Sequence, residues 1–526
     1  MLAKWEDFPI FGDFNKRTDI NFDTEDLDNF FMIHDNNGKK KFAFLATPGL
    51  KSELTLFAGV VQSRGLLAVG GFMYGVFDQQ VWKVDQFLVP QYLGSINSNM
   101  GSVSMSSNNA GQIIIVDGQS GYIYDSNTGV FSQISDPGFP PFPLDVGFLD
   151  GYFVIPSGNS RTYQISALND GTKWDALDSA QIQAYPGLNI GVGVVNRRLY
   201  FMKTDSTEVW YNQGQADFPF RRDNNLLFNF GCMTASSIAS QFGYLCWLAQ
   251  DSDGIGSVMM TTGQDPIRIS DDSIDNLLST FDNPTDVTTY IYKDSGHIFY
   301  VMNFTTDDIT IIFDITLFVD LQIKHWHKMS MRQIFPNAGF TNPTPKRHLG
   351  NCHAYFNGKH YLGAYNSATI YSFSRLYATN DGDNISRLRT CGHFFDAAYR
   401  MQQVDQLQID MEMGIGSSGV DQTFVDDWGT NVGDDIVDNL GNNIIFNANY
   451  SPNDDPQVYL YISRDGGHTF GNAHHASIGR IGDRKARAIF RRLGIARDFV
   501  MMFVIDSPVY PITILGAAIK YKVLNK

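Results

Sequence analysis

Short apolar runs alternate with polar turns over most of this chain, from Leu66 to Phe373. Gly, Asn, Asp or Ser residues close each run, which is the pattern of a strand that ends in a tight turn. The pattern predicts seven antiparallel hairpins: Leu66–Val69 with Val81–Val84, Ile113–Val116 with Tyr122–Tyr124, Tyr152–Ile155 with Thr162–Ile165, Leu199–Met202 with Glu208–Tyr211, Tyr244–Leu248 with Gly256–Met260, His297–Met302 with Ile309–Phe313, and His360–Tyr365 with Thr369–Phe373.

The stretch from Val194 to Ser270 indicates that these hairpins repeat at a regular distance. Its second hairpin follows the first by about 40 residues, and propeller blades recur at about 40–50 residues. The sequence therefore predicts an all-β fold of propeller-like blades, each built from antiparallel hairpins.

Helical patterns are few, and the clearest runs from Ser270 to Phe281. We expect Ser270 to cap it, because Ser is a preferred N-cap residue and two Asp residues follow in the first turn. Its apolar residues Ile274, Leu277, Leu278 and Phe281 fall on one face, so the helix is expected to pack on a sheet.

The pattern changes after about Cys391, where a β-rich C-terminal region begins. Strands are predicted at Val404–Met413, Val458–Ile462, Phe499–Ile505 and Ile512–Val523, and they would form a sandwich or close a blade. The predicted division is an N-terminal arm with the first strands at 1–60, the propeller-like domain at 61–395, and the C-terminal region at 396–526 with a loop-rich insertion at 414–456.

Composition narrows the classes of function. The chain has 526 residues, of which 43% are hydrophobic, and a formal net charge of −16. An acidic total argues against tight wrapping of nucleic acid, although it is compatible with a DNA conduit whose wall repels the polymer. Four scattered cysteines indicate a reducing compartment, and no signal peptide or membrane-spanning run is recognisable, so we expect a soluble protein made in a cytoplasm.

The sequence predicts no enzyme, no cofactor and no metal site. It contains neither a phosphate-binding glycine loop nor a nucleophile elbow. The segment Asp251–Gly254 begins like a calcium loop but lacks its later ligands, so we interpret it as a hairpin turn. The histidines His325, His327, His348, His353 and His360 have no zinc spacing, and we expect them at interfaces or partly buried.

Two local motifs remain as candidate sites. The turn from Ser463 to Phe470, with Asp465, Gly467 and Thr469 between them, looks like an Asp-box, in which the carboxylate accepts backbone N–H groups and the aromatic ring packs beneath. The main basic island of the chain comprises Arg480, Arg484, Lys485, Arg487, Arg491, Arg492 and Arg497. It would contact a phosphate backbone or an acidic partner, or form a solvated face or a subunit contact.

An ordered set of motifs between about residues 190 and 525 resembles the packaged-DNA stabilisation proteins of short-tailed bacteriophages, also called tail nozzle or tail hub proteins. The motifs are Glu208–Tyr211, Phe218–Arg221, Gly231–Cys232, Trp247–Asp251, Gly254–Gly256, Pro266–Ser270, Trp326–Met329, Asn351–Ser372, Arg387–Arg389, Leu407–Gly416, Ser463–Phe470, Arg491–Arg497 and Gly516–Ala517. Residues 1–190 share only the rhythm of hairpins.

The resemblance implies a structural protein of the virion tail, assembled in the host bacterial cytoplasm. It implies a sixfold ring of propeller-like subunits below the portal and adaptor, which retains packaged double-stranded DNA and guides it out without binding it tightly. Expected partners are other copies of the chain, the adaptor and portal-side tail proteins, and a tail needle, fibre or spike. The alternative is a propeller-type tail glycosidase or glycan-binding module, which the Asp-box suggests.

Overall fold

The structure is a computed structural model that describes the chain except for residues 1–3, 16–24, 37–39, 216, 252–253, 255, 333–345, 415–423, 426–444, 447–454, 481, 507–511 and 525–526. The chain divides into two compact units, which are described separately. The propeller unit contains Ser52–Trp326 and Lys346–Ser372, and the sandwich unit contains Met1–Lys51, His327–Pro345 and Phe373–Lys526. The division therefore differs from the predicted boundaries at 60 and 395, and the physical reason lies in strand pairing between distant parts of the chain.

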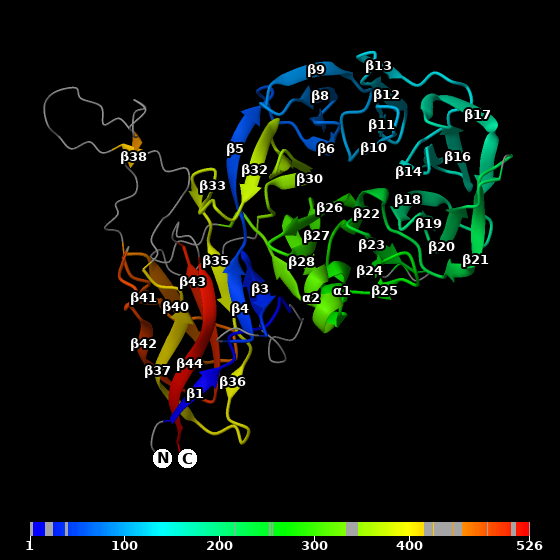
Figure 1. Ribbon diagram of the computed structural model, residues 1–526. Coiled ribbons are helices and arrows are strands. Elements are labelled where there is room, and N and C mark those ends of the chain that lie inside the picture. The colour runs from blue at the N-terminus through cyan, green and yellow to red at the C-terminus, as the bar shows by residue number, and fades with distance from the viewer. Residues whose placement is uncertain are drawn as a thin grey trace, which may run out of the picture. The chain divides into compact units, whose positions relative to one another are not determined.

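The propeller unit is a ring of small antiparallel sheets, or blades, that follow one another in chain order (Figure 1). Five blades have four strands each, and within each blade the strands follow the chain order from the innermost strand to the outermost. They are β6 (Ser63–Val69), β7 (Phe72–Phe77), β8 (Gln80–Val84) and β9 (Pro90–Ser95); β10 (Ser104–Ser107), β11 (Gln112–Val116), β12 (Gly121–Asp125) and β13 (Val130–Gln133); β14 (Gly147–Leu149), β15 (Tyr152–Pro156), β16 (Thr162–Ala167) and β17 (Asp170–Gln181); β18 (Asn189–Val195), β19 (Arg198–Lys203), β20 (Thr207–Asn212) and β21 (Phe220–Phe228); and β22 (Ala239–Gln241), β23 (Tyr244–Gln250), β24 (Gly256–Thr261) and β25 (Ile267–Arg268).

Two further blades complete the ring. The sixth contains β26 (Val287–Asp294), β27 (His297–Phe304) and β28 (Ile309–Asp314), and the seventh contains β30 (Gly350–Phe356), β31 (Lys359–Ala364), β32 (Thr369–Ser374) and β5 (Gly49–Thr55). In the seventh blade, Leu56 N donates to Ala368 O at 2.9 Å, and the hydroxyls of Thr55 and Thr369 lie 3.1 Å apart. An early strand thus closes a blade made from residues about 300 positions later.

Apolar side chains fill the spaces between neighbouring blades. Tyr163 on β16 stacks on Phe201 of β19 with ring centroids 4.1 Å apart, and Tyr74 on β7 lies 5.7 Å from Tyr124 on β12. Glycine allows the closest approach: a Cβ atom at Gly193 on β18 would lie 2.5 Å from the side chain of Leu245 on the next blade. Five clusters of buried apolar residues lie between neighbouring blades, so the hydrophobic core of the propeller unit is distributed around the ring.

The structure confirms six of the seven predicted hairpins as neighbouring strands of one blade. The first prediction is wrong, because Leu66–Val69 pairs with β7 and not with Val81–Val84. The missed strand β7 lies between two-residue turns, Gly70–Gly71 and Asp78–Gln79, and these turns are too short to interrupt the apolar pattern clearly.

The predicted helix forms as α1 (Asp272–Ser279), but its cap is Asp271 and not Ser270. The Asp271 carboxylate accepts the N–H of Ile274 at 2.9 Å, whereas the Ser270 hydroxyl accepts the N–H of Val258 on β24 at 3.0 Å. A second helix, α2 (Ile315–Leu321), is capped by Asp314 in the same way. Two short 3-10 helices occupy Ala235–Ser237 and Pro284–Asp286.

The sandwich unit contains two antiparallel sheets. One sheet has the strand order β3 (Phe30–His34), β4 (Phe42–Ala46), β44 (Thr513–Val523), β37 (Gln402–Met411) and β42 (Ala488–Ala496), and β1 (Lys4–Phe8) also pairs with β44. The other has the order β2 (Asp26–Asp28), β35 (Arg387–Thr390), β43 (Asp498–Ile505), β40 (Gln457–Ser463) and β41 (His474–Ser477), with β36 (Phe394–Phe395) beside β43. Lys328 of β29 (Trp326–Lys328) pairs with Asp28 in parallel.

Long-range pairing explains why the N-terminal residues do not form a separate arm. Strand β1 runs antiparallel to β44, with Phe8 opposite Ala517, and Leu27 of β2 lies opposite Arg389 of β35. The four strands predicted for the C-terminal region form as β37, β40, β43 and β44. Two small hairpins complete the description, β33 (Thr379–Asn380) with β34 (Asp383–Asn384) and β38 (Phe424–Val425) with β39 (Ile445–Phe446). Apart from β38 and β39, the predicted insertion at 414–456 lies almost entirely outside the described residues.

Candidate functional site

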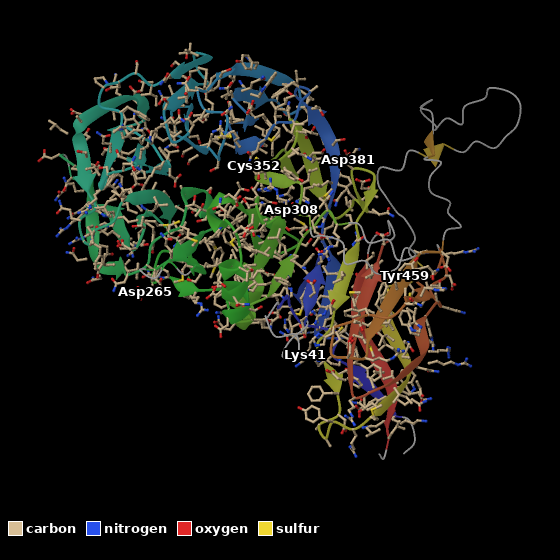
Figure 2. The ribbon with its side chains drawn as sticks, turned by 180° about the vertical axis from the view of Figure 1, so that it is seen from behind. Lys41, Asp265, Asp308, Cys352, Asp381 and Tyr459 are labelled. Carbon is tan, nitrogen blue, oxygen red and sulfur yellow. The ribbon has the colours of Figure 1, made fainter. Side chains whose placement is uncertain are left out.

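A cavity of about 280 Å³ lies at the centre of the propeller ring. The innermost strands β6, β10, β26 and β30 and the segments before β14 and β22 contribute its walls, and Cys352 marks the position of β30 in Figure 2. The lining includes Arg64, Ser104, Asp145, Tyr290 and Asn351. Because the innermost strands are in contact all around the ring, small and polar side chains share this narrow space.

Among the described residues that line this cavity, Asp145 is the single carboxylate. Its Oδ1 accepts hydrogen bonds from Ser104 Oγ at 2.6 Å and from Val146 N at 2.8 Å, and its Oδ2 accepts one from Val192 N at 3.0 Å. Burial raises the pKa of Asp145, and these donors partly offset the rise. The carboxylate therefore connects three consecutive blades through β10, β14 and β18.

Arg64 and Asn351 form hydrogen bonds beside the other walls of the cavity. Asn351 on β30 bonds to Ser63 of β6 and Thr288 of β26. Arg64 donates to the backbone oxygens of Asp78, Ser98, Met100 and Gly101 over distances of 2.6–2.9 Å. A guanidinium group that is engaged at Nε, Nη1 and Nη2 has little capacity left for a ligand. Arg64 therefore anchors the loops that carry these four backbone oxygens.

The buried histidines and cysteines of the propeller unit are held neutral. Burial lowers the pKa of His348 and of His353 to about 3, and raises the pKa of Cys232 and of Cys352 to about 12. His353 Nε2 lies 2.9 Å from His360 Nδ1. In the sandwich unit, His327 is almost fully buried as well, and burial raises the pKa of Cys391 to about 12.

The described residues contain no group of three or more His, Cys, Asp or Glu side chains that could hold a metal ion. Asp253 of the calcium-like turn lies outside them. Within the same part of the chain, no helix has the length and apolar character needed to span a membrane.

The Asp-box-like turn joins β40 to β41 in the sandwich unit. Ser463 Oγ donates to Asp465 Oδ1 at 2.6 Å, and the N–H and hydroxyl of Thr469 donate to the same carboxylate at 2.9 and 2.6 Å. The Gly467 N–H donates to Ser463 Oγ at 2.8 Å. The Ser463 and Thr469 side chains lower the pKa of Asp465 well below its usual range. Phe470 packs against a cluster that includes Tyr461. These hydrogen bonds and this packing therefore stabilise the turn itself.

The basic island lies in the sandwich unit, in the segment just before β42, on β42, and at Arg497 just after it. All seven side chains are exposed: Arg480, Arg484, Lys485, Arg487, Arg491, Arg492 and Arg497. Among the described residues, strand β42 is the last strand in its sheet, so these charges lie at the edge of that sheet. We call this set of seven residues the basic edge.

A β-bulge explains why two consecutive arginines of β42 are both exposed. The register with β37 shifts between Val404, opposite Gly494, and Gln406, opposite Arg491. Two residues of β42 therefore face one residue of β37, and Arg492 adopts a φ of 59°. The bulge turns Arg492 outward next to Arg491 and leaves Leu493 buried.

The Asp-box-like turn and the basic edge both belong to the sandwich unit, whereas residues of the propeller unit line the cavity. The polar residues of that cavity were missed by sequence reasoning. Arg64, Asp145 and Asn351 match no functional motif, and each makes at least one hydrogen bond to a residue more than 30 positions away. The one available signal was an isolated charged residue beside an apolar run, which is a weak signal.

A seven-bladed β-propeller and a β-sandwich define the described part of this chain as a two-part β protein. Two protein-family models match it: bacteriophage P22 Gp10, beta-propeller, over residues 6–375, and bacteriophage P22 Gp10, beta-sandwich, over residues 438–521. The chain belongs to the bacteriophage P22 Gp10 family, and it is a structural protein of a phage tail. The fold class and the family resemblance predicted from the sequence are thereby confirmed.

Several solved structures match part of this chain at low identity. A streptogramin B lyase is 12% identical, with 62% of this chain and 98% of the lyase covered and a TM-score of 0.40. A virginiamycin B lyase from Staphylococcus aureus is 10% identical, with 62% and 99% covered and a TM-score of 0.41. A computationally designed protein, Ika8, is 11% identical, with 62% and 99% covered and a TM-score of 0.36. Likeness of this extent says nothing about activity. A search of curated proteins found none that matches the chain.

Proposed function

We propose that six copies of this chain form the nozzle or hub ring of a short phage tail, below the portal and adaptor. The ring retains packaged DNA and guides it out during ejection. The observation that carries this proposal is the match of propeller and sandwich to one family of phage tail proteins. The number of copies, the place in the tail and the role in ejection follow from the resemblance of the sequence motifs.

The narrow centre of the propeller supports a conduit made by several copies. Its cavity has a volume of about 280 Å³. The major groove of duplex DNA alone is about 12 Å wide. Since DNA does not fit through the centre of one propeller, a passage for it requires a space between subunits. A closed ring of identical subunits has such a central space.

The distribution of charge supports a wall that does not hold DNA tightly. The propeller unit contains 28 Asp and Glu residues against 15 Lys and Arg, a formal charge of −13. The sandwich unit contains 27 against 24, a formal charge of −3. A propeller surface that faces the lumen would repel phosphate groups and let the genome slide past.

The proposal assigns the chain to the virion tail, with assembly in the host bacterial cytoplasm. Its partners are further copies of itself, the adaptor and portal-side tail proteins, and a tail needle, fibre or spike. It requires no cofactor and no chemical step. The neutral histidines and thiols of the propeller unit support a function that depends on shape and assembly.

Electron microscopy of the purified chain mixed with adaptor and portal rings tests this proposal. We expect a sixfold ring on the adaptor. Particles assembled without the chain should lose their genome, measured as DNA that becomes sensitive to nuclease, and addition of the chain during assembly should restore protection. A chain that cleaves a glycan as a monomer and never joins the tail would favour the glycosidase alternative.

A further inference from the structure

The basic edge differs from several other basic residues of the sandwich unit, which form ion pairs within the unit. Elsewhere in the unit, Lys40 pairs with Asp7 at 3.1 Å, Arg389 with Glu25 at 2.9 Å, and Arg400 with Asp396 at 2.9 Å. Among the described residues, no carboxylate forms an ion pair with any member of the basic edge. Its charges are therefore available to a ligand.

The local density of positive charge is high for so acidic a chain. Residues 480–497 contain seven Lys and Arg residues and one acidic residue, Asp483. The positive face continues onto the neighbouring strands, because Arg491 lies opposite Gln406, and Gln406 lies opposite Lys520 of β44. Amide and cationic side chains along one row can donate hydrogen bonds to phosphate oxygens without sequence preference.

The chemistry of this edge favours a phosphate backbone over an acidic protein. The cores of protein interfaces are depleted of charge and enriched in aromatic side chains. The only aromatic residue within 480–497 is Phe490, which is 2% exposed and belongs to the core of the sandwich. Six of the seven residues of the basic edge are arginines, whose planar guanidinium groups match phosphate geometry.

We propose that the basic edge of the sandwich unit binds the phosphate backbone of double-stranded DNA, weakly and with strong salt dependence. This inference uses the proposed function only to choose DNA as the polymer. It adds a positive contact to a conduit that is otherwise acidic, and it assigns that contact to Arg480, Arg484, Lys485, Arg487, Arg491, Arg492 and Arg497.

Fluorescence anisotropy of a labelled 30-base-pair duplex with the full-length chain, from 50 to 200 mM salt, tests the inference. Each phosphate contact contributes about −0.9 to the slope of log K against log salt concentration. The variant Arg484→Gln/Lys485→Gln/Arg491→Gln should therefore show a slope that is less steep by about 2–3. At 50 mM salt its affinity should fall at least tenfold.

A matched control removes the same charge from the propeller unit. Lys173, Arg197 and Arg221 are exposed, and the variant Lys173→Gln/Arg197→Gln/Arg221→Gln has the same net charge as the first. Its slope and affinity should equal those of the parent chain, which separates a local contact from an effect of total charge. Circular dichroism should give equal melting temperatures for all three chains.

The inference fails if the parent chain does not bind DNA at 50 mM salt, or if both variants lose affinity equally. Equal binding of poly-glutamate and DNA would assign the edge to an acidic protein partner instead. Aggregation of the first variant with unchanged DNA affinity would assign its charges to the protection of a free sheet edge. The nuclease-protection assay on assembled particles is independent of these results, so the proposed function can stand when this inference fails.

Discussion

Asn351 Nδ2 on β30 donates a hydrogen bond of 2.7 Å to the carbonyl oxygen of Ser63 on β6, across 288 positions of the sequence. The same side chain accepts the Thr288 hydroxyl of β26 at 2.9 Å through its Oδ1. One buried amide thus links the sixth and seventh blades to the first. It lies where the ring must close, and it satisfies polar groups that water reaches poorly.

Removal of this amide should weaken ring closure. We expect Asn351→Ala to lower the free energy of unfolding of the propeller unit by about 2–4 kcal/mol, since it breaks buried hydrogen bonds and leaves their partners unsatisfied. Urea unfolding followed by tryptophan fluorescence measures the loss. Gln133→Ala, at an exposed position, should change it by less than about 0.5 kcal/mol. Equal effects of the two substitutions would contradict a closing role for Asn351.

Gly193 should tolerate a side chain only if the opposite residue is shortened. Gly193→Ala brings a Cβ atom to 2.5 Å from Leu245, and we expect a cost of about 1–3 kcal/mol from overpacking. In the double variant with Leu245→Ala, the clash is absent, so the effects should be clearly non-additive in a double-mutant cycle. Additive effects would show that the blades separate to admit the methyl group.

Acidification should destabilise the propeller unit through His348. Burial lowers the folded-state pKa of this histidine from 6.5 to about 3. The unfolded chain then binds a proton below pH 6.5 while the folded chain does not, so stability is lost as the pH falls from about 6.5 towards 3. His348 Nδ1 accepts the Gly350 N–H at 3.2 Å, and His348→Asn keeps an acceptor there without a titrating group. Melting temperatures at pH 7, 5.5 and 4.5 should fall less in this variant than in the parent chain.

The turn at Asp465 should persist in acid. Its hydrogen bonds to Ser463 and Thr469 lower the carboxyl pKa, so the folded chain keeps the carboxylate charged as the pH drops through the usual Asp range. The stability that these hydrogen bonds contribute is full above the unfolded-state pKa of 3.8 and is lost progressively as the pH falls from there towards the lower folded-state pKa. Asp465→Ala should open the turn between β40 and β41, and limited proteolysis should then cleave within 463–470 faster than in the parent chain. Asp465→Asn, which keeps one acceptor oxygen, should show an intermediate rate. Equal rates for all three chains at pH 7 would argue against this account of the turn.

Part of the candidate surface could be recognised directly from the sequence. The arginines at 480–497 are dense enough to stand out in an acidic chain, and their exposure follows from their position on a sheet edge. The exposure of Arg492 could not be predicted, because a strand that alternates strictly would have turned it towards the core. The bulge opposite Val404 and Gln406 decides its direction, and a bulge depends on the partner strand.

The sequence by itself determined the all-β class, six hairpins and one helix, because period-2 patterns and turn residues act over a few positions. Only the tertiary structure decided that β5 completes the seventh blade and that β1 pairs with β44. It also decided that Asp145 joins three blades. These features depend on partners hundreds of positions apart or on different blades. Their free energy comes from burial and hydrogen bonds that exist only after the ring and the sandwich have closed.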